Sequence, residues 1–88
     1  MEKRDVSYHL TAHVEKAIAE RGILRPWIEQ VLLDPLQVER DKEDETLRYA
    51  LGRVPERGDS VLRVIYTETT TPWIVVTAFF DRKARRML

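Results

Sequence analysis

Apolar residues recur at helical spacing near the start of the chain, and the residues on either side of this stretch are suited to helix ends. Thr11 precedes it, and its hydroxyl can accept a hydrogen bond from an unpaired amide of the first turn. Gly22 follows it, and glycine ends helices because it adopts the left-handed conformation without a Cβ clash. Between them, one helical stripe is formed by Val14, Ala17, Ile18 and Arg21. This pattern predicts a helix over residues 12–21.

A second helix is predicted directly after this glycine. Pro26 suits its first turn, where a missing N–H costs no hydrogen bond. The apolar positions that follow at helical spacing are Trp27, Ile28, Val31 and Leu32. The helix is expected to end at Leu33-Asp34, since the residue before Pro35 avoids the α conformation. Two short helices joined by a glycine turn form an αα-hairpin.

From residue 36 the apolar pattern changes to a period of two, which is typical of strands. Four strands are predicted, over residues 36–40, 46–51, 61–67 and 73–80. Within the second strand, Arg48 points away from Leu47, Tyr49 and Leu51. Turns are expected at residues 41–45, 55–59 and 69–72. After the last strand, Asp81 is expected to cap a final helical turn.

The order of elements is therefore α-α-β-β-β-β, with short joining loops. Short connections favour antiparallel neighbours, because a parallel pair needs a long crossover. The helices have to bury their apolar stripes, and one face of the sheet is the large apolar surface available. We predict an α+β fold with two N-terminal helices packed on one face of a four-stranded antiparallel curled sheet. Residues 1–88 form a single domain, in which residues 6–10 are an extended lead-in.

Composition narrows the class of protein. Of the 88 residues, 43% are apolar, which is enough for one globular domain. There is no cysteine, which excludes disulfides and thiolate metal sites and fits a reducing cytoplasm. The charged N-terminal residues are not followed by an apolar stretch, so no signal peptide is predicted, and no apolar run is long enough to span a membrane. We therefore predict a cytoplasmic protein without membrane contact.

The net charge is zero, but the charges are unevenly placed. Residues 1–47 carry seven Lys/Arg and eleven Asp/Glu, a net charge of −4, whereas residues 48–88 carry eight and four, a net charge of +4. The acidic excess comes largely from residues 39–45. Such asymmetry suggests one surface that faces a polyanion, and ordinary solvated charge is the alternative. In the basic tail, the candidates for contact with RNA phosphates are Arg82, Lys83 and Arg85.

His9 and His13 are the two histidines, spaced so that one helix face could carry both. With a third ligand this spacing would suggest zinc, but a helix capped by Thr11 leaves His9 outside it. We therefore predict no metal site. His13 alone lies in a first helical turn, where the positive helix end favours a neutral imidazole that can act as a base. A surface histidine without a function is the alternative.

Arg48 and Arg63 lie on adjacent predicted strands. If both point to the face that the helices leave uncovered, their guanidinium groups form a phosphate site there. The alternative is that ion pairs with Glu39 or Glu68 hold them, since opposite charges across strands are ordinary. Tyr66 is a candidate for stacking on a base, although aromatic residues in strands are more often part of the core.

Several short motifs occur in a specific order along the chain. They are His13, Glu20-Arg21-Gly22-Ile23, Asp34-Pro35, Arg48-Tyr49 and Val75-Val76-Thr77-Ala78-Phe79. From about Tyr8 to Asp81 the chain resembles the small bacterial family catalogued as domain of unknown function 4258. The resemblance implies a RelE-like fold, shared with BrnT-type toxins and barnase-like ribonucleases. The histidine, strand arginine and late-strand threonine that recur in the family correspond to His13, Arg48 and Thr77. A departure is Arg25-Pro26, where the family has a serine-like helix cap.

We therefore predict a metal-independent endoribonuclease, the toxin of a toxin–antitoxin system, that needs no cofactor. In this reaction the ribose 2′-hydroxyl attacks the adjacent phosphorus, which requires a base, an acid and cations for the developing charge. The predicted catalytic residues are His13, Arg48, Arg63, Thr77 and Glu20.

The expected partners are RNA and a cognate antitoxin protein, and unpaired strand edges allow a homodimer. The alternative is a non-catalytic RelE-like module that binds RNA or a protein partner. The zero net charge and the supply of only two histidines favour this alternative.

Overall fold

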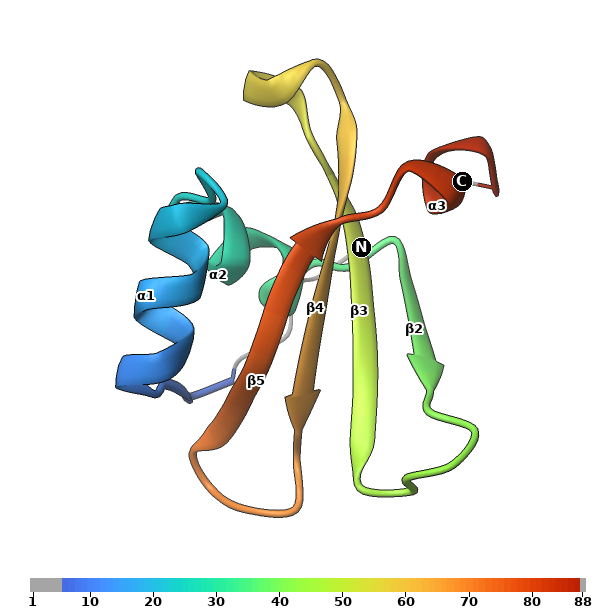
Figure 1. Ribbon diagram of the computed structural model, residues 1–88. Coiled ribbons are helices and arrows are strands. Elements are labelled where there is room, and N and C mark those ends of the chain that lie inside the picture. Colours follow the sequence, from blue (N-terminus) through green and yellow to red (C-terminus); the bar gives the residue numbers. More distant parts are fainter. Residues whose placement is uncertain (1–5, 88) are drawn as a thin grey trace.

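The computed structural model describes residues 6–87, and for residues 85–87 it describes the backbone alone. Along the chain the elements are β1 (Tyr8–Leu10), α1 (Ala12–Glu20), α2 (Arg25–Leu33), β2 (Gln37–Arg40), β3 (Leu47–Val54), the 3-10 helix η1 (Pro55–Arg57), β4 (Ser60–Thr67), β5 (Trp73–Phe80) and α3 (Arg82–Met87). Figure 1 shows α1 and α2 together on one side of the sheet and α3 on the other. Within the described residues, no helix has both the length and the apolar character needed to cross a membrane.

Both ends of α1 are formed by the residues that the sequence analysis predicted for them. The hydroxyl of Thr11 accepts a hydrogen bond from the amide of Val14 at 3.2 Å, which confirms the predicted N-cap. At the other end Gly22 has a φ of +68°, the left-handed conformation that glycine tolerates. The amide of Ile23 then donates to the carbonyl oxygen of Ile18 at 2.9 Å, so the chain turns sharply back. This turn fixes the direction in which α2 begins.

The sheet has five strands in the order β1-β5-β4-β3-β2. The pairs β2–β3, β3–β4 and β4–β5 are antiparallel, as predicted, whereas β1 pairs parallel with β5. The predicted four-stranded, antiparallel, curled sheet is therefore corrected to an open mixed sheet of five strands. The extra strand comes from the lead-in at residues 6–10, of which Tyr8–Leu10 pairs with Trp73–Val75. The parallel pairing is possible because two helices and three strands lie between these segments in the chain.

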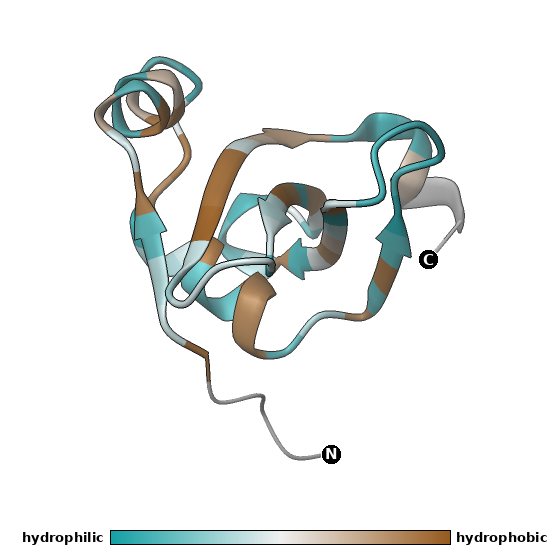
Figure 2. Cartoon of the chain, turned by 90° about the horizontal axis from the view of Figure 1, so that it is seen from below, coloured by the Kyte–Doolittle hydropathy of each residue, from teal (hydrophilic) through white to brown (hydrophobic). Residues whose placement is uncertain are grey.

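The main core lies between the two N-terminal helices and one face of the sheet, as predicted. The helical stripes supply Val14, Ile18, Ile28, Val31 and Leu32, all of them buried in this cluster. Figure 2 shows both teal and brown residues along the helices, as expected for helices with one buried face. On the opposite face, α3 covers one end of the sheet, where Ala84 packs with Leu51 and Val61.

Candidate nucleic-acid interface

Arg48 and Arg63 point to opposite faces of the sheet. Arg48 lies opposite Tyr66, which belongs to the core beneath the helices, whereas Arg63 lies opposite Leu51, which packs with α3. Residues directly opposite each other on neighbouring strands share a face, and successive residues alternate between faces. The expectation that the two guanidinium groups converge on the uncovered face is therefore wrong.

Arg63 lies between two carboxylates. Its guanidinium nitrogens are 2.8 Å from Asp81 and 3.3 Å from Glu39, and its Cζ lies 5.2 Å from the ring centroid of Tyr49. Its side chain is 17% exposed. Because acids on two elements surround the charge, Arg63 links β4 to β2 and to the start of α3. The ion pair with Glu39 is the alternative that the sequence left open.

Asp81 caps α3, as predicted. Its Oδ1 accepts hydrogen bonds from the amides of Lys83 at 2.9 Å and Ala84 at 3.0 Å, while Oδ2 contacts Arg63. The hydrogen bond from the Ala84 amide, helped by Arg63, holds the pKa of Asp81 below its usual range, although burial opposes the shift. One carboxylate thus joins the helix cap to the ion-pair network.

We expect Asp81→Asn to lower the free energy of unfolding near pH 7 and to lower it less near pH 3. Because the folded-state pKa of Asp81 is depressed, the contribution of its charge is present above the unfolded pKa of about 4. That contribution is lost as the pH falls through the folded pKa. Because asparagine can still cap the helix, the difference in unfolding free energy between Asp81→Asn and the wild type measures mainly the contribution of the Asp81 charge. Urea titrations at both pH values measure it, and an equal loss at both would contradict this assignment.

Arg48 fastens the β2–β3 connection to the start of β3. Its Nε lies 3.1 Å from Glu68, and its Nη1 donates to the backbone carbonyl oxygen of Glu45 at 2.7 Å. The side chain is half-buried, and Glu68 is the partner that the alternative interpretation named. Arg48 therefore has a structural role beside helix-covered residues, and its catalytic role stays a prediction.

Tyr66 is removed from the list of residues that can contact RNA. Its side chain is fully buried, and its ring stacks on that of Trp73 with centroids 4.8 Å apart. A base has no access to this ring, so the prediction of stacking at Tyr66 is wrong. Arg82 and Lys83 are exposed on α3, and the side chain of Arg85 lies outside the described residues.

Thr77 is held by an arginine that the sequence did not identify as functional. Nη1 of Arg21 donates to Oγ1 of Thr77 at 3.0 Å and to the carbonyl oxygen of Ala78 at 2.8 Å. These bonds lie on β5 beyond Trp73–Val75, the part that pairs with β1. The only signal in the sequence is that Arg21 continues the helical stripe, which places it on the side of α1 that meets the sheet.

A second arginine reaches the same place from η1. Nη1 of Arg57 lies 3.8 Å from the position that a Cβ on Gly22 would take, and its Cζ lies 4.2 Å from the ring centroid of Phe80. Phe80 follows Ala78, the residue that Arg21 contacts, by two positions on β5. The two guanidinium groups therefore meet neighbouring points of one strand. We call Arg21, Gly22, Arg57, Thr77 and Phe80 the Arg21–Arg57 patch.

The patch carries the positive charge of two guanidinium groups. Among the described residues, neither Arg21 nor Arg57 has a carboxylate within ion-pair distance, in contrast to Arg25, Arg48 and Arg63. Both side chains are exposed. A guanidinium has five N–H donors, so the bonds from Nη1 to β5 leave Arg21 with further donors. Exposed donors beside a glycine, where no side chain covers the backbone, are suited to a phosphate group.

His13 and Glu20 lie on α1 and Arg21 directly follows it, and all three are exposed. Around the helix axis His13 is about 80° from Arg21 and about 20° from Glu20, but it lies about 12 Å before Arg21 along the axis. Of the predicted catalytic residues, Thr77 therefore contacts Arg21, and Glu20 is the residue before Arg21 in the chain. The structure leaves His13 two turns away and places Arg48 and Arg63 elsewhere on the sheet.

The two histidines lie on different elements of the fold. His9 lies on β1 and His13 on α1, and both are exposed. Within residues 6–84, whose side chains are described, no group of three His, Cys, Asp or Glu side chains is placed to hold a metal ion. The chemistry of the patch is that of fixed cations.

The fold and the site define an α+β domain with an exposed arginine patch where its first helix ends. The family described as domain of unknown function (DUF4258) matches residues 10–80, and the chain belongs to this family. No curated protein and no solved structure matches it significantly. The family description assigns no activity, so function has to be argued from the residues themselves.

Proposed function

We propose that this domain binds RNA and holds the phosphate backbone on the Arg21–Arg57 patch. The observation that carries the proposal is the pair of exposed guanidinium groups without a carboxylate partner among the described residues. Guanidinium donors match phosphate oxygens, and neutralising phosphate charge supplies most of the non-specific affinity for nucleic acids. Hydrogen bonds to β5 position Arg21, and the Phe80 ring positions Arg57, so little side-chain freedom is lost on binding.

Neighbouring residues extend this surface. The half-buried Trp27 meets Phe80 edge to face, with centroids 6.1 Å apart, and its indole offers a platform for a base. Arg82 and Lys83 follow Phe80 by two and three residues and continue the positive charge onto α3. An RNA strand held at the patch is therefore expected to run from the end of α1 toward α3.

The mapping experiment uses the uniformly ¹⁵N-labelled protein and a single-stranded RNA of roughly 12 nucleotides, a length typical of one small binding module. Amide signals of Gly22, Arg57 and Ala78 are expected to shift on titration at low salt. Signals of Gln37 and Val38, on the far edge strand, serve as the internal control and should stay in place. Shifts confined to other surfaces, or no shifts at all, would contradict the proposal.

An endoribonuclease of the RelE and BrnT type is the second candidate, and one observation favours it. Exposed His13 and Glu20 share one face of α1, about 20° apart around its axis, and Arg21, which holds Thr77, follows Glu20 in the chain. A strand bound to the patch that also passes His13 would meet an acid–base group there. Acting as a toxin with a cognate antitoxin, such an enzyme would need the antitoxin to cover this side of α1.

Replacing His13 by alanine separates the two candidates. If the domain cleaves RNA with His13 as base or acid, cleavage is expected to fall by about 10²–10⁴-fold while RNA binding is retained. His9→Ala removes the other exposed histidine and should leave cleavage unchanged. Cleavage of labelled RNA by the purified proteins, and growth of cells that express them, measure the effect. Undiminished cleavage by His13→Ala would eliminate the catalytic role, whereas absence of cleavage by the wild type leaves the binding module.

A further inference from the structure

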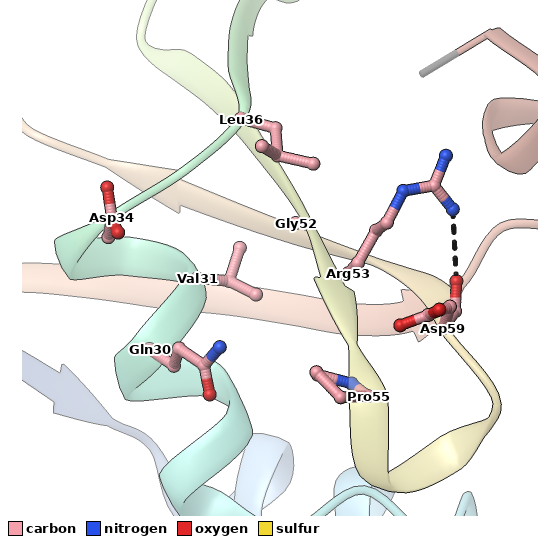
Figure 3. A pocket seen from close by; sticks show the side chains of 8 residues that line it. All are labelled: Gln30, Val31, Asp34, Leu36, Gly52, Arg53, Pro55 and Asp59. Atoms are coloured by element: carbon pink, nitrogen blue, oxygen red, sulfur yellow. Dashed lines mark hydrogen bonds between the residues drawn. The ribbon is translucent and has the colours of Figure 1, made fainter. Parts of the chain in front are cut away.

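A groove lies at the other end of the helix pair, between α2 and the end of β3. It has a volume of about 310 Å³ and is lined by Gln30, Val31, Asp34, Leu36, Gly52, Arg53, Pro55 and Asp59. In the close view of Figure 3, α2 forms one wall and β3 the other, with Leu36 at one end and Pro55 toward the opposite end. None of these residues belongs to the Arg21–Arg57 patch.

The groove follows from the packing of α2 on β3. A Cβ on Gly52 would lie 3.0 Å from Cγ2 of Val31, so glycine lets the helix approach the strand at this level. The register of β2 with β3 runs from Arg48 to Leu51, whereas β3 continues to Val54. The groove therefore flanks the part of β3 that extends past β2. At its end, Leu36 is 61% exposed, a high value for a leucine beside a groove.

The rim of the groove carries two carboxylates, those of Asp34 and Asp59, and one guanidinium, that of Arg53. Asp34 ends α2, where the helix dipole adds negative potential, and Asp59 lies past β3 in Figure 3, where its backbone carbonyl oxygen accepts a hydrogen bond from Nη1 of Arg53 at 3.2 Å. Within the described part of the chain, neither carboxylate is within ion-pair distance of a basic side chain. The segment that follows, residues 34–45, carries six acidic and two basic side chains, a net charge of −4. Of this segment, Asp34 and Leu36 line the groove, whereas the acidic loop of residues 41–45 precedes the start of β3 and lies at the opposite end of that strand.

We propose that this groove docks a partner protein through an extended segment that carries a large apolar side chain flanked by Lys or Arg. The apolar side chain packs between Val31, Leu36 and Pro55. The flanking cations pair with Asp34 and Asp59. This surface is independent of the proposed RNA site and would remain if that proposal failed.

The size of the groove and the charge of its rim both favour binding of such a segment. The groove is at the lower end of the range for small-molecule sites and is large enough for one aliphatic or aromatic side chain. Two carboxylates against the one guanidinium of Arg53 leave the rim with a net charge of −1, which favours a cationic segment over phosphate. An apolar anchor in a pocket with a polar rim is the usual arrangement of the residues that dominate a protein interface. A segment of mixed apolar and basic character matches both features.

The probe is the peptide acetyl-Gly-Lys-Leu-Lys-Gly-amide, titrated into the ¹⁵N-labelled protein. Amides of Val31, Gly52 and Asp59 are expected to shift, with a dissociation constant on the order of 1 mM, because a short flexible peptide makes few contacts. The same peptide with Glu in place of Lys tests the charge, and the one with Gly in place of Leu tests the apolar anchor. Both are expected to bind at least about fivefold more weakly.

Two double variants complete the test. Asp34→Asn with Asp59→Asn removes the rim charges and is expected to weaken the Lys peptide by about three- to tenfold, since each exposed ion pair contributes a modest amount. Asparagine is chosen because Asp59 has a φ of +59°, a conformation that asparagine tolerates. Glu43→Gln with Glu45→Gln removes the same charge from the loop before β3, away from the groove, and should change affinity less than about twofold. Equal binding of the Lys and Glu peptides, shifts outside the groove, no shifts, or RNA shifting the groove amides would each overturn the proposal.

Discussion

Replacing Arg21 and Arg57 together by glutamine is expected to weaken RNA binding by about 30-fold or more. Each guanidinium is expected to contribute about 1 kcal/mol or more through charge-assisted hydrogen bonds to phosphate, and about 2 kcal/mol corresponds to this factor. Glutamine keeps a polar side chain of moderate length, so the main loss is the charge. Fluorescence anisotropy of a labelled single-stranded RNA at low salt measures the affinity.

The matched control for this double variant is Arg40→Gln with Lys42→Gln. These two exposed cations lie at the end of β2 and in the loop after it, and their removal changes the net charge by the same amount. It is expected to alter affinity by about twofold or less. Because Arg21 also bonds to Thr77 and Ala78, urea unfolding of both proteins is needed to show that the fold is retained. A similar loss of affinity in both double variants would argue against a localised site.

Replacing Leu32 by alanine is expected to lower the free energy of unfolding by about 2–5 kcal/mol. Leu32 is fully buried on α2 within the cluster that joins both helices to the sheet. Truncation leaves a cavity that the surrounding β-branched residues fill poorly, so transfer and cavity terms add. A domain of this size has a total stability of only about 5–10 kcal/mol, so the melting temperature should fall by roughly 10 °C or more.

Leu24→Ala is the control for this change, because Leu24 lies at the start of α2 and is 55% exposed. Its loss should cost less than about 1 kcal/mol. Thermal and urea unfolding of both variants measure the difference. Equal costs at the two positions would mean that α2 does not pack on the sheet as described.

The parts of the fold that the sequence predicted have strong local causes. Thr11 and Gly22 end α1 through hydrogen bonds and a backbone conformation that involve near neighbours alone. The strand over Trp73–Phe80 matches its predicted bounds, because β-branched and aromatic side chains favour strands over its length. By contrast β1 has three residues, and its pairing with β5 depends on chain more than sixty positions away. The local sequence predicted an extended lead-in at residues 6–10, but not the strand that it pairs with.

The candidate site was harder to predict because it depends on register and on distant contacts. The alternation of residues along β3 correctly predicted that Arg48 points away from Leu47 and Tyr49. Whether Arg63 shares the sheet face of Arg48 depends on the register between β3 and β4, which the sequence does not show. A shift of one residue in that register moves every side chain of a strand to the other face. The hydrogen bond from Arg21 to Thr77 joins residues that are 56 positions apart in the chain. The spacing of apolar residues in the sequence cannot predict such a contact.

The salt dependence of RNA binding tests the central claim most directly. For a single strand, the slope of log K against log salt concentration changes by about 0.7 for each phosphate that the protein neutralises. If Arg21 and Arg57 each hold one phosphate, the double glutamine variant is expected to show a slope less steep than the wild type by about 1.4. A variant with reduced affinity but an unchanged slope would show that these residues support the fold and that RNA phosphates are bound elsewhere.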